Sequence, residues 1–250
     1  MRFRVERDVL ADAVAWTARS LPARPPVPVL AGLLVEAAAD GLTLSGFDYE
    51  VSTRIFIPAD VLEPGRVLVS GRLLADISRS LPARPVEIST EGPKVQLVCG
   101  SARFSLLTLP VEEYPTLPDM PSLTGTLPGA RLSAAVLQVA VAAGRDDTLP
   151  VLTGIRIELD GDKVTLAATD RYRLAVRELV WSPEQTGLES VALVPARTLA
   201  ETAKSLASCE SVAVALARSS SGEGLVGFDG GGRRTTTRLL EGEFPKYRSL

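Results

Sequence analysis

The sequence Pro28-Val29-Leu30-Ala31-Gly32 returns 122 residues later as Pro150-Val151-Leu152-Thr153-Gly154. The same shift places Phe47-Asp48 on Thr169-Asp170, and slightly larger shifts place Arg72–Asp76 on Arg197–Glu201. An internal match of this length is typical of a duplicated structural unit. Because loops tolerate insertions, the small changes in shift fit loop insertions between the matched segments.

A proline-rich stretch separates the two repeats. Five prolines lie from Pro110 to Pro128, and hydrophobic periodicity there is weak, which is typical of a linker. We therefore predict two domains, residues 1–120 and 121–250. Because Phe244-Pro245-Lys246-Tyr247 matches the segment that opens this linker, we expect a third repeat to be absent from the chain.

Each repeat mixes helical and strand periodicity. Alternating segments such as 42–44, 95–98, 191–194 and 212–215 indicate strands. Apolar residues at helical spacing near the start of each repeat, and again after residues 71 and 196, indicate two helices per repeat. The expected fold class is therefore α+β, with two similar domains.

Composition argues against an enzyme. The 250 residues are 46% hydrophobic and 23% charged, as in an ordinary globular protein, and they include no histidine. Histidine is the commonest general base and metal ligand, so its absence removes most hydrolase mechanisms. Cys99 and Cys209 have no partner pattern, and no phosphate-binding glycine motif occurs. We expect no catalytic residues, no metal and no cofactor, and the lack of a long apolar run or signal segment predicts a cytoplasmic protein.

The second helix of each repeat carries a charged stripe. Arg72, Asp76 and Arg79 are spaced i, i+4 and i+7, opposite an apolar side predicted to hold Leu73, Leu74, Ile77 and Leu81. Arg197, Glu201 and Lys204 repeat the stripe. One such stripe alone is typical of a solvated helix face with an ion pair, but its recurrence favours a binding surface.

The chemistry of the stripes suits a polyanion. Phosphates need only positive charge and carry no base code, so a basic helix face fits duplex DNA read without sequence preference. No aromatic series interleaves the basic residues, which disfavours single strands. The predicted DNA contacts are Arg72, Arg79, Arg197 and Lys204, with the loop residues Arg24 and Arg145 beside the helices.

Several stretches resemble the bacterial sliding clamp family, the beta subunit of DNA polymerase III. They are Arg24–Leu30, Ser101–Leu106, Thr169–Ala175 and Glu243–Arg248. The resemblance covers the whole chain as the first two of three clamp domains. It implies a non-catalytic processivity factor with inner helices and outer antiparallel sheets, which closes as a head-to-tail homodimeric ring around duplex DNA when full length. Without the third domain, we expect the chain to be mostly monomeric.

The resemblance also implies a cleft for short linear peptides of the replicative polymerase and the clamp loader. The residues carried over by the match are Leu152, Thr169, Tyr172, Arg173, Leu174, Pro245 and Leu250. An alternative for Thr169 to Leu174 is a strand and its turn, with Leu152 and Leu174 in the core. The first repeat has Val51 and Ser52 where the second has Arg173 and Leu174, so it lacks the cationic and apolar pair.

Two other functions remain open from the residues alone. The chain could be a two-domain protein-interaction module that does not enclose DNA. It could also be an enzyme that uses carboxylate or arginine chemistry, which needs a pocket of convergent titratable groups.

Overall fold

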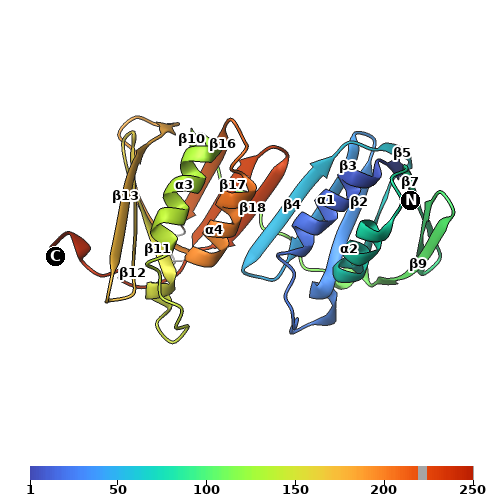
Figure 1. The fold of residues 1–250 in the computed structure, drawn as a ribbon, viewed down its shortest axis with the longest axis horizontal. Helices are drawn as coiled ribbons and strands as arrows, with labels where there is room; N and C mark the ends of the chain where they lie inside the picture. Colours follow the sequence, from blue (N-terminus) through green and yellow to red (C-terminus); the bar gives the residue numbers. More distant parts are fainter. Residues whose placement is uncertain (219–223, 250) are drawn as a thin grey trace. The chain divides into compact units, whose positions relative to one another are not determined.

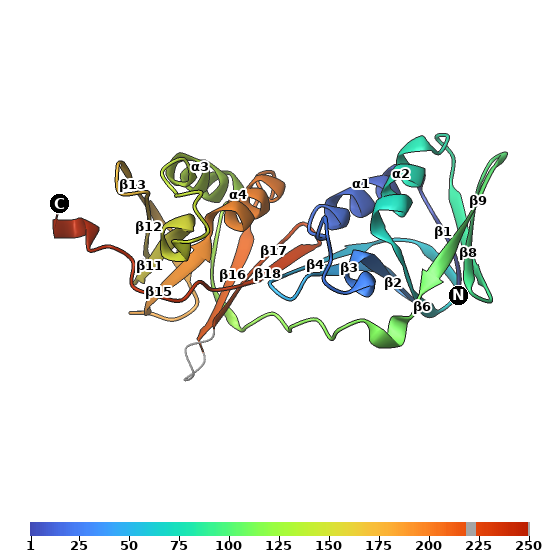
Figure 2. The ribbon, with the colours of Figure 1, turned by 90° about the horizontal axis from the view of Figure 1, so that it is seen from below.

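The computed structural model describes residues 1–218 and 224–249, which form two compact units, Met1–Pro118 and Asp119–Leu250. In both units, two α-helices lie side by side on one face of antiparallel strands (Figures 1 and 2). This arrangement confirms the predicted α+β class.

Unit 1 contains two α-helices and nine strands within this described part of the chain. The helices are α1 (Arg7–Ala18) and α2 (Gly71–Ser80), and the short 3-10 helices are η1 (Pro28–Ala31) and η2 (Val111–Glu113). The strands are β1 (Arg2–Val5), β2 (Gly32–Ala38), β3 (Gly41–Phe47), β4 (Val51–Ile57), β5 (Asp60–Glu63), β6 (Gly65–Ser70), β7 (Val86–Glu91), β8 (Lys94–Cys99) and β9 (Ala102–Leu109). They lie in the order β4-β3-β2-β6-β9-β8-β7-β1-β5. A short pairing between β6 and β9 joins the two halves of this series.

Unit 2 repeats this plan. Its helices are α3 (Gly129–Ala140) and α4 (Ala196–Ser205), with η3 (Pro150–Thr153) and η4 (Tyr247–Ser249). One sheet has the order β13-β12-β11-β15, built from β11 (Gly154–Asp160), β12 (Lys163–Thr169), β13 (Leu174–Val180) and β15 (Glu189–Pro195). The strands β14-β10-β16-β17-β18 follow one another in a second sheet, built from β10 (Leu123–Leu127), β14 (Ser182–Pro183), β16 (Val212–Arg218), β17 (Gly224–Gly230) and β18 (Arg233–Arg238).

The matched sequences occupy matched places. Each copy of the Pro-Val-Leu motif forms a 3-10 helix, η1 or η3, that leads into the strand at the centre of its repeat, β2 or β11. The β4-β3-β2-β6 strands correspond to β13-β12-β11-β15, and α2 corresponds to α4. The internal match therefore reflects a structural duplication.

Each unit has its own apolar core beneath its helices. Leu10, Val14 and Leu74 reach the core of unit 1 from α1 and α2, and Val136 and Leu199 reach that of unit 2 from α3 and α4. The predicted apolar side of α2 is wrong at Leu73, whose exposed fraction is 48%. The buried arc of α2 includes Leu74, Ile77 and Ser78, and at about 100° per residue Leu73 lies outside that arc.

Candidate nucleic-acid interface and peptide-binding cleft

The solvent-facing side of α2 carries the first predicted stripe. Arg72, Asp76 and Arg79 are all exposed, whereas Leu74 and Ile77 point into the core. The guanidinium of Arg79 forms an ion pair with the Asp76 carboxylate one turn earlier. Such a surface pair contributes at most about 1 kcal/mol to stability, so the stripe does little for the fold.

The second stripe on α4 has the same pattern of cation, carboxylate and cation. Arg197 Nε lies 3.3 Å from Glu201 Oε1, and the Arg197 side chain is 91% exposed. Lys204 is exposed in the last turn of α4. Leu199 and Ala203 face the core instead, so the charged residues lie on the side of α4 that faces solvent.

Arg24 and Arg145 occupy equivalent loops. Arg24 follows α1 and Arg145 follows α3, and both side chains are exposed. The Arg145 loop is held by Asp146, whose Oδ1 accepts the N–H and hydroxyl of Thr148 at 3.0 and 2.6 Å. These bonds lower the pKa of the Asp146 carboxyl. Each unit thus presents two cations on its second helix, and Arg24 and Arg145 each add a cation in the loop after the first helix of their unit.

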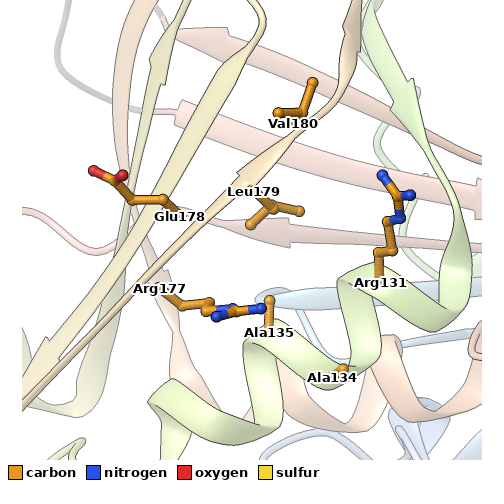
Figure 3. Close-up of a pocket in the computed structure, with 7 residues that line it drawn as sticks. All are labelled: Arg131, Ala134, Ala135, Arg177, Glu178, Leu179 and Val180. Carbon is orange, nitrogen blue, oxygen red and sulfur yellow. The ribbon is translucent and has the colours of Figure 1, made fainter.

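A basic pocket lies between α3 and the strand β13. Its volume is about 270 Å³, and Arg131 and Arg177 line it together with Glu178 and an apolar wall of alanines, Leu179 and Val180. Figure 3 shows Arg177 extending toward Ala135 of α3 and Arg131 projecting from the same helix. Two guanidinium groups at one pocket favour an anionic group over a cation.

The predicted cleft residues gather at one end of the β13-β12-β11-β15 sheet. Thr169 ends β12 and pairs with Leu174, the first residue of β13. Leu152 belongs to η3, which leads directly into β11, the other neighbour of β12. Leu174 is 40% exposed and Leu152 is half-buried. The alternative in which both leucines belong to the core therefore does not hold for Leu174.

The C-terminal segment is fixed beside this end of the sheet by a small apolar cluster. Phe244 and Tyr247 pack with Ala167 and Leu193, and Val151 contacts the same cluster. Val151 precedes Leu152 and Phe244 precedes Pro245, so the cluster brings η3 and the C-terminal segment to the same strands. Pro245 is exposed. Leu250 lies outside the described residues.

Glu158 on β11 anchors the C-terminal segment through polar contacts. Its carboxylate accepts hydrogen bonds from Arg156 Nε at 2.6 Å, from the Tyr247 hydroxyl at 3.2 Å and from the Arg248 guanidinium. Burial alone would raise the pKa of Glu158, but the bonds and charges of the two arginines outweigh it and lower the pKa. These residues border a cavity of about 690 Å³ that also includes Pro245.

The turn between β12 and β13 is built around Asp170. Its Oδ1 accepts the backbone N–H groups of Tyr172 and Arg173, both at 3.1 Å, and its Oδ2 accepts from Arg173 Nε at 2.9 Å. Partial burial raises the pKa of Asp170, but these three bonds and the Arg173 charge outweigh it, so the pKa is lowered. Tyr172 is 93% exposed at the tip of the turn.

The Thr169 hydroxyl is already occupied inside the turn. It donates to the Arg173 carbonyl at 2.8 Å and accepts the Arg171 N–H at 3.2 Å. Thr169 is also buried. Its hydroxyl therefore holds the turn, and of the predicted cleft residues Tyr172 and Arg173 present polar groups to solvent.

Sequence reasoning gave no role to Asp170, Glu158 or Phe244. The match of Asp48 with Asp170 was the signal for the first, because an aspartate before a tight turn favours side-chain bonds to the following N–H groups. No comparable signal marks Glu158, since its partners Tyr247 and Arg248 lie far along the chain.

The described residues contain no cluster of three or more cysteine, aspartate or glutamate side chains able to hold a metal ion. Within the same residues, no helix combines the length and apolar character needed to cross a bilayer.

Solved structures place the chain in a fold class. The crystal structure of the DNA polymerase sliding clamp from Bacillus subtilis matches all of this chain and 67% of its own, with a TM-score of 0.92 and 26% identity. A DNA polymerase III subunit beta from Pseudomonas aeruginosa, solved bound to griselimycin, matches with a TM-score of 0.91 and 28% identity, again over all of this chain and 67% of its own. The architecture is therefore that of the sliding clamp fold.

Sequence comparisons identify the family. The model of the DNA polymerase III beta subunit N-terminal domain matches residues 1–118, and that of the central domain matches residues 126–246. The beta sliding clamp of Streptomyces coelicolor is 67% identical over all 250 residues, which cover 66% of that protein. A beta sliding clamp of Micrococcus luteus is 53% identical over 250 residues, and the match covers all of this chain and 80% of that protein. The chain belongs to the beta sliding clamp family, and it spans about two thirds of the length of the Streptomyces coelicolor relative.

Proposed function

We propose that the chain acts in a DNA polymerase processivity factor, a sliding clamp that encircles duplex DNA and tethers the replicative polymerase and the clamp loader. The clamp works in the cytoplasm and performs no chemical step. Its protomers join head to tail in a homodimeric ring, with residues 1–120 and 121–250 as two of the clamp domains. The observation that carries the proposal is the recurrence of one exposed cation, carboxylate and cation pattern on α2 and α4.

The helix faces support contact with the DNA backbone. Arg72, Arg79, Arg197 and Lys204 are exposed residues that serve neither core. Long, flexible basic side chains bind phosphates through charge and carry no base code. A surface of this kind tolerates movement along the duplex, which a processivity factor requires.

The side chains at the end of the β13-β12-β11-β15 sheet support the proposed peptide cleft. Leu152, Leu174 and Pro245 supply apolar surface, and Tyr172 and Arg173 supply exposed polar groups. Apolar floors with a few polar groups suit short peptides with hydrophobic anchors. Because a relative was solved bound to griselimycin, that compound is a ligand to test for competition with the peptide.

The peptide cleft is tested by titration with a fluorescent peptide that carries the clamp-binding segment of the replicative polymerase. Leu174→Asp is expected to abolish binding, because a carboxylate would lie unpaired against an apolar anchor. Val180→Asp is the matched control, since Val180 lies on the same strand and is 60% exposed. Circular dichroism verifies the fold of both variants. Equal affinity in wild type and a folded Leu174→Asp variant contradicts the proposed cleft.

A further inference from the structure

The two repeats contain the same four-residue turn. Asp48 Oδ1 accepts the N–H groups of Glu50 and Val51 at 3.0 and 2.6 Å, as Asp170 Oδ1 does for Tyr172 and Arg173. The second residue of each turn has a left-handed backbone, with φ of 75° at Tyr49 and 77° at Arg171. The aspartate and its two backbone bonds are therefore part of the duplicated fold.

The left-handed positions are the same in both copies although neither residue is glycine. A bulky side chain at positive φ is uncommon and persists where surrounding bonds hold the backbone in place. In both turns the aspartate supplies those bonds to the next two N–H groups. The aspartate thus has the same structural role in both turns.

The second turn has additional contacts that the first turn lacks. Asp170 Oδ2 accepts a hydrogen bond from Arg173 Nε at 2.9 Å, and the Thr169 hydroxyl donates one to the Arg173 carbonyl at 2.8 Å. The matched positions in the first turn are Val51 and Phe47, which have neither a charge nor a hydroxyl. The turn therefore forms without these contacts. The Thr169 bond holds the Arg173 backbone, and the Asp170 Oδ2 bond orients the Arg173 side chain.

Arg173 keeps two guanidinium nitrogens for a ligand. Asp170 engages Nε alone, and within residues 1–218 and 224–249 the structure gives the terminal nitrogens no partner. The side chain is 59% exposed, and its neighbour Leu174 is also exposed. A guanidinium held at Nε presents its terminal N–H groups in one direction, which suits a carbonyl or carboxylate acceptor.

We propose that Asp170 is a positioning residue of the peptide cleft. It orients the Arg173 guanidinium toward a carbonyl or carboxylate of the bound peptide and sets the start of β13, from which Leu174 meets an apolar anchor. This inference rests on the proposed peptide cleft. Because a bound side chain loses less freedom when it is already oriented, the benefit of Asp170 appears in the affinity for peptide.

The decisive variant is Asp170→Asn. The amide oxygen still accepts the two backbone N–H groups, but the amide nitrogen faces Arg173 Nε and cannot accept from it. We expect the affinity for the polymerase-derived peptide to fall about two- to fivefold, the range that corresponds to an exposed ion pair. In an Arg173→Ala background, Asp170→Asn is expected to change the affinity no further, because the group through which it acts is gone.

Asp48→Ala and Asp170→Ala form the matched pair. Each variant removes the side chain that accepts two backbone hydrogen bonds in its own copy of the turn. Both are therefore expected to lower the unfolding temperature by similar amounts. Only Asp170→Ala is expected to weaken peptide binding. A loss of binding that follows only from a distorted turn would persist in the Arg173→Ala background, so the loss of the Asp170→Asn effect in that background is what separates positioning from structure.

The outcomes separate the two proposals. Binding that is weakened by Leu174→Asp but unchanged by Asp170→Asn overturns the positioning role and leaves the cleft in place. Equal effects of Asp170→Asn with and without Arg173 also overturn it. If the unmodified chain binds no peptide, or if binding is indifferent to Leu174→Asp, the cleft and the positioning role both fail.

Discussion

Gly129 illustrates how closely the two helices of unit 2 approach each other. A Cβ added at this residue would lie 2.0 Å from the Leu206 carbonyl oxygen and 2.8 Å from that of Cys209. The Gly129 N–H also donates to the Cys209 carbonyl at 3.0 Å. The start of α3 therefore touches the backbone after α4, which leaves no space for a side chain.

Gly129→Ala is expected to destabilise unit 2 by about 1–3 kcal/mol, because the new methyl group meets backbone that cannot rotate away. Urea unfolding measures the effect. Gln138→Ala, at an exposed position of the same helix, is the control and should change stability little. A Gly129→Ala variant as stable as this control contradicts the close packing.

Glu158 is an ionisable residue that holds the C-terminal segment through Tyr247 and Arg248. The pKa of Glu158 is lowered in the folded chain. The charge of Glu158 therefore contributes fully to stability above the ordinary glutamate pKa of 4.5. This contribution is lost as the pH falls through the lower pKa of the folded state. Glu158→Gln removes this contribution. We expect the difference in unfolding free energy between wild type and Glu158→Gln to be largest near neutral pH and to shrink below pH 4.5. A difference that is independent of pH would mean that the charge of Glu158 does not anchor Tyr247 and Arg248.

At the scale of elements, α2 and α4 each combine two cations with one carboxylate on the exposed face. Asp76 and Glu201 pair with Arg79 and Arg197, and they also repel phosphates. Because exposed pairs of this kind contribute little to folding, we expect the two carboxylates to moderate the proposed DNA affinity at small structural cost.

The double variant Asp76→Asn with Glu201→Gln is therefore expected to bind duplex DNA more tightly than wild type at low salt, with a change in unfolding free energy below about 1 kcal/mol. Fluorescence anisotropy with two unrelated duplexes provides the measurement. Unchanged or weaker DNA affinity would show that these helix faces do not meet the phosphates.

The elements also show which parts of the fold were predictable. The duplication, the two helices per repeat and the α+β class were evident because they depend on local periodicity and on the match between Pro28–Gly32 and Pro150–Gly154. The exposure of Leu73 was not, since a short helix buries an arc too narrow for every apolar residue near it.

The candidate cleft could be predicted only in part from the sequence. Family resemblance supplied Leu152, Thr169 and Leu174, but it did not indicate that the Thr169 hydroxyl is used inside the turn. The contacts of Glu158 with Tyr247 and Arg248 join segments about 90 residues apart, and no local pattern encodes such a pairing.

At the scale of the whole molecule, DNA binding depends on where charge is placed within a protein whose formal net charge is −3. An acidic chain approaches DNA only if its cations are concentrated where the duplex lies. We propose that the exposed stripes of α2 and α4 provide that concentration in each unit, and the family relationship makes duplex DNA the expected polyanion.

The most direct test of DNA binding by these helix faces is the salt dependence of duplex affinity, measured for wild type and for a variant with Arg72, Arg79, Arg197 and Lys204 all changed to Ala. We expect the variant to bind unrelated duplexes more weakly by the same factor. The slope of log K against log salt should fall in magnitude by up to about 0.9 for each phosphate that the variant no longer neutralises. An unchanged slope in a folded variant, or a weakening that depends on DNA sequence, would contradict the assignment of these helix faces to the DNA backbone.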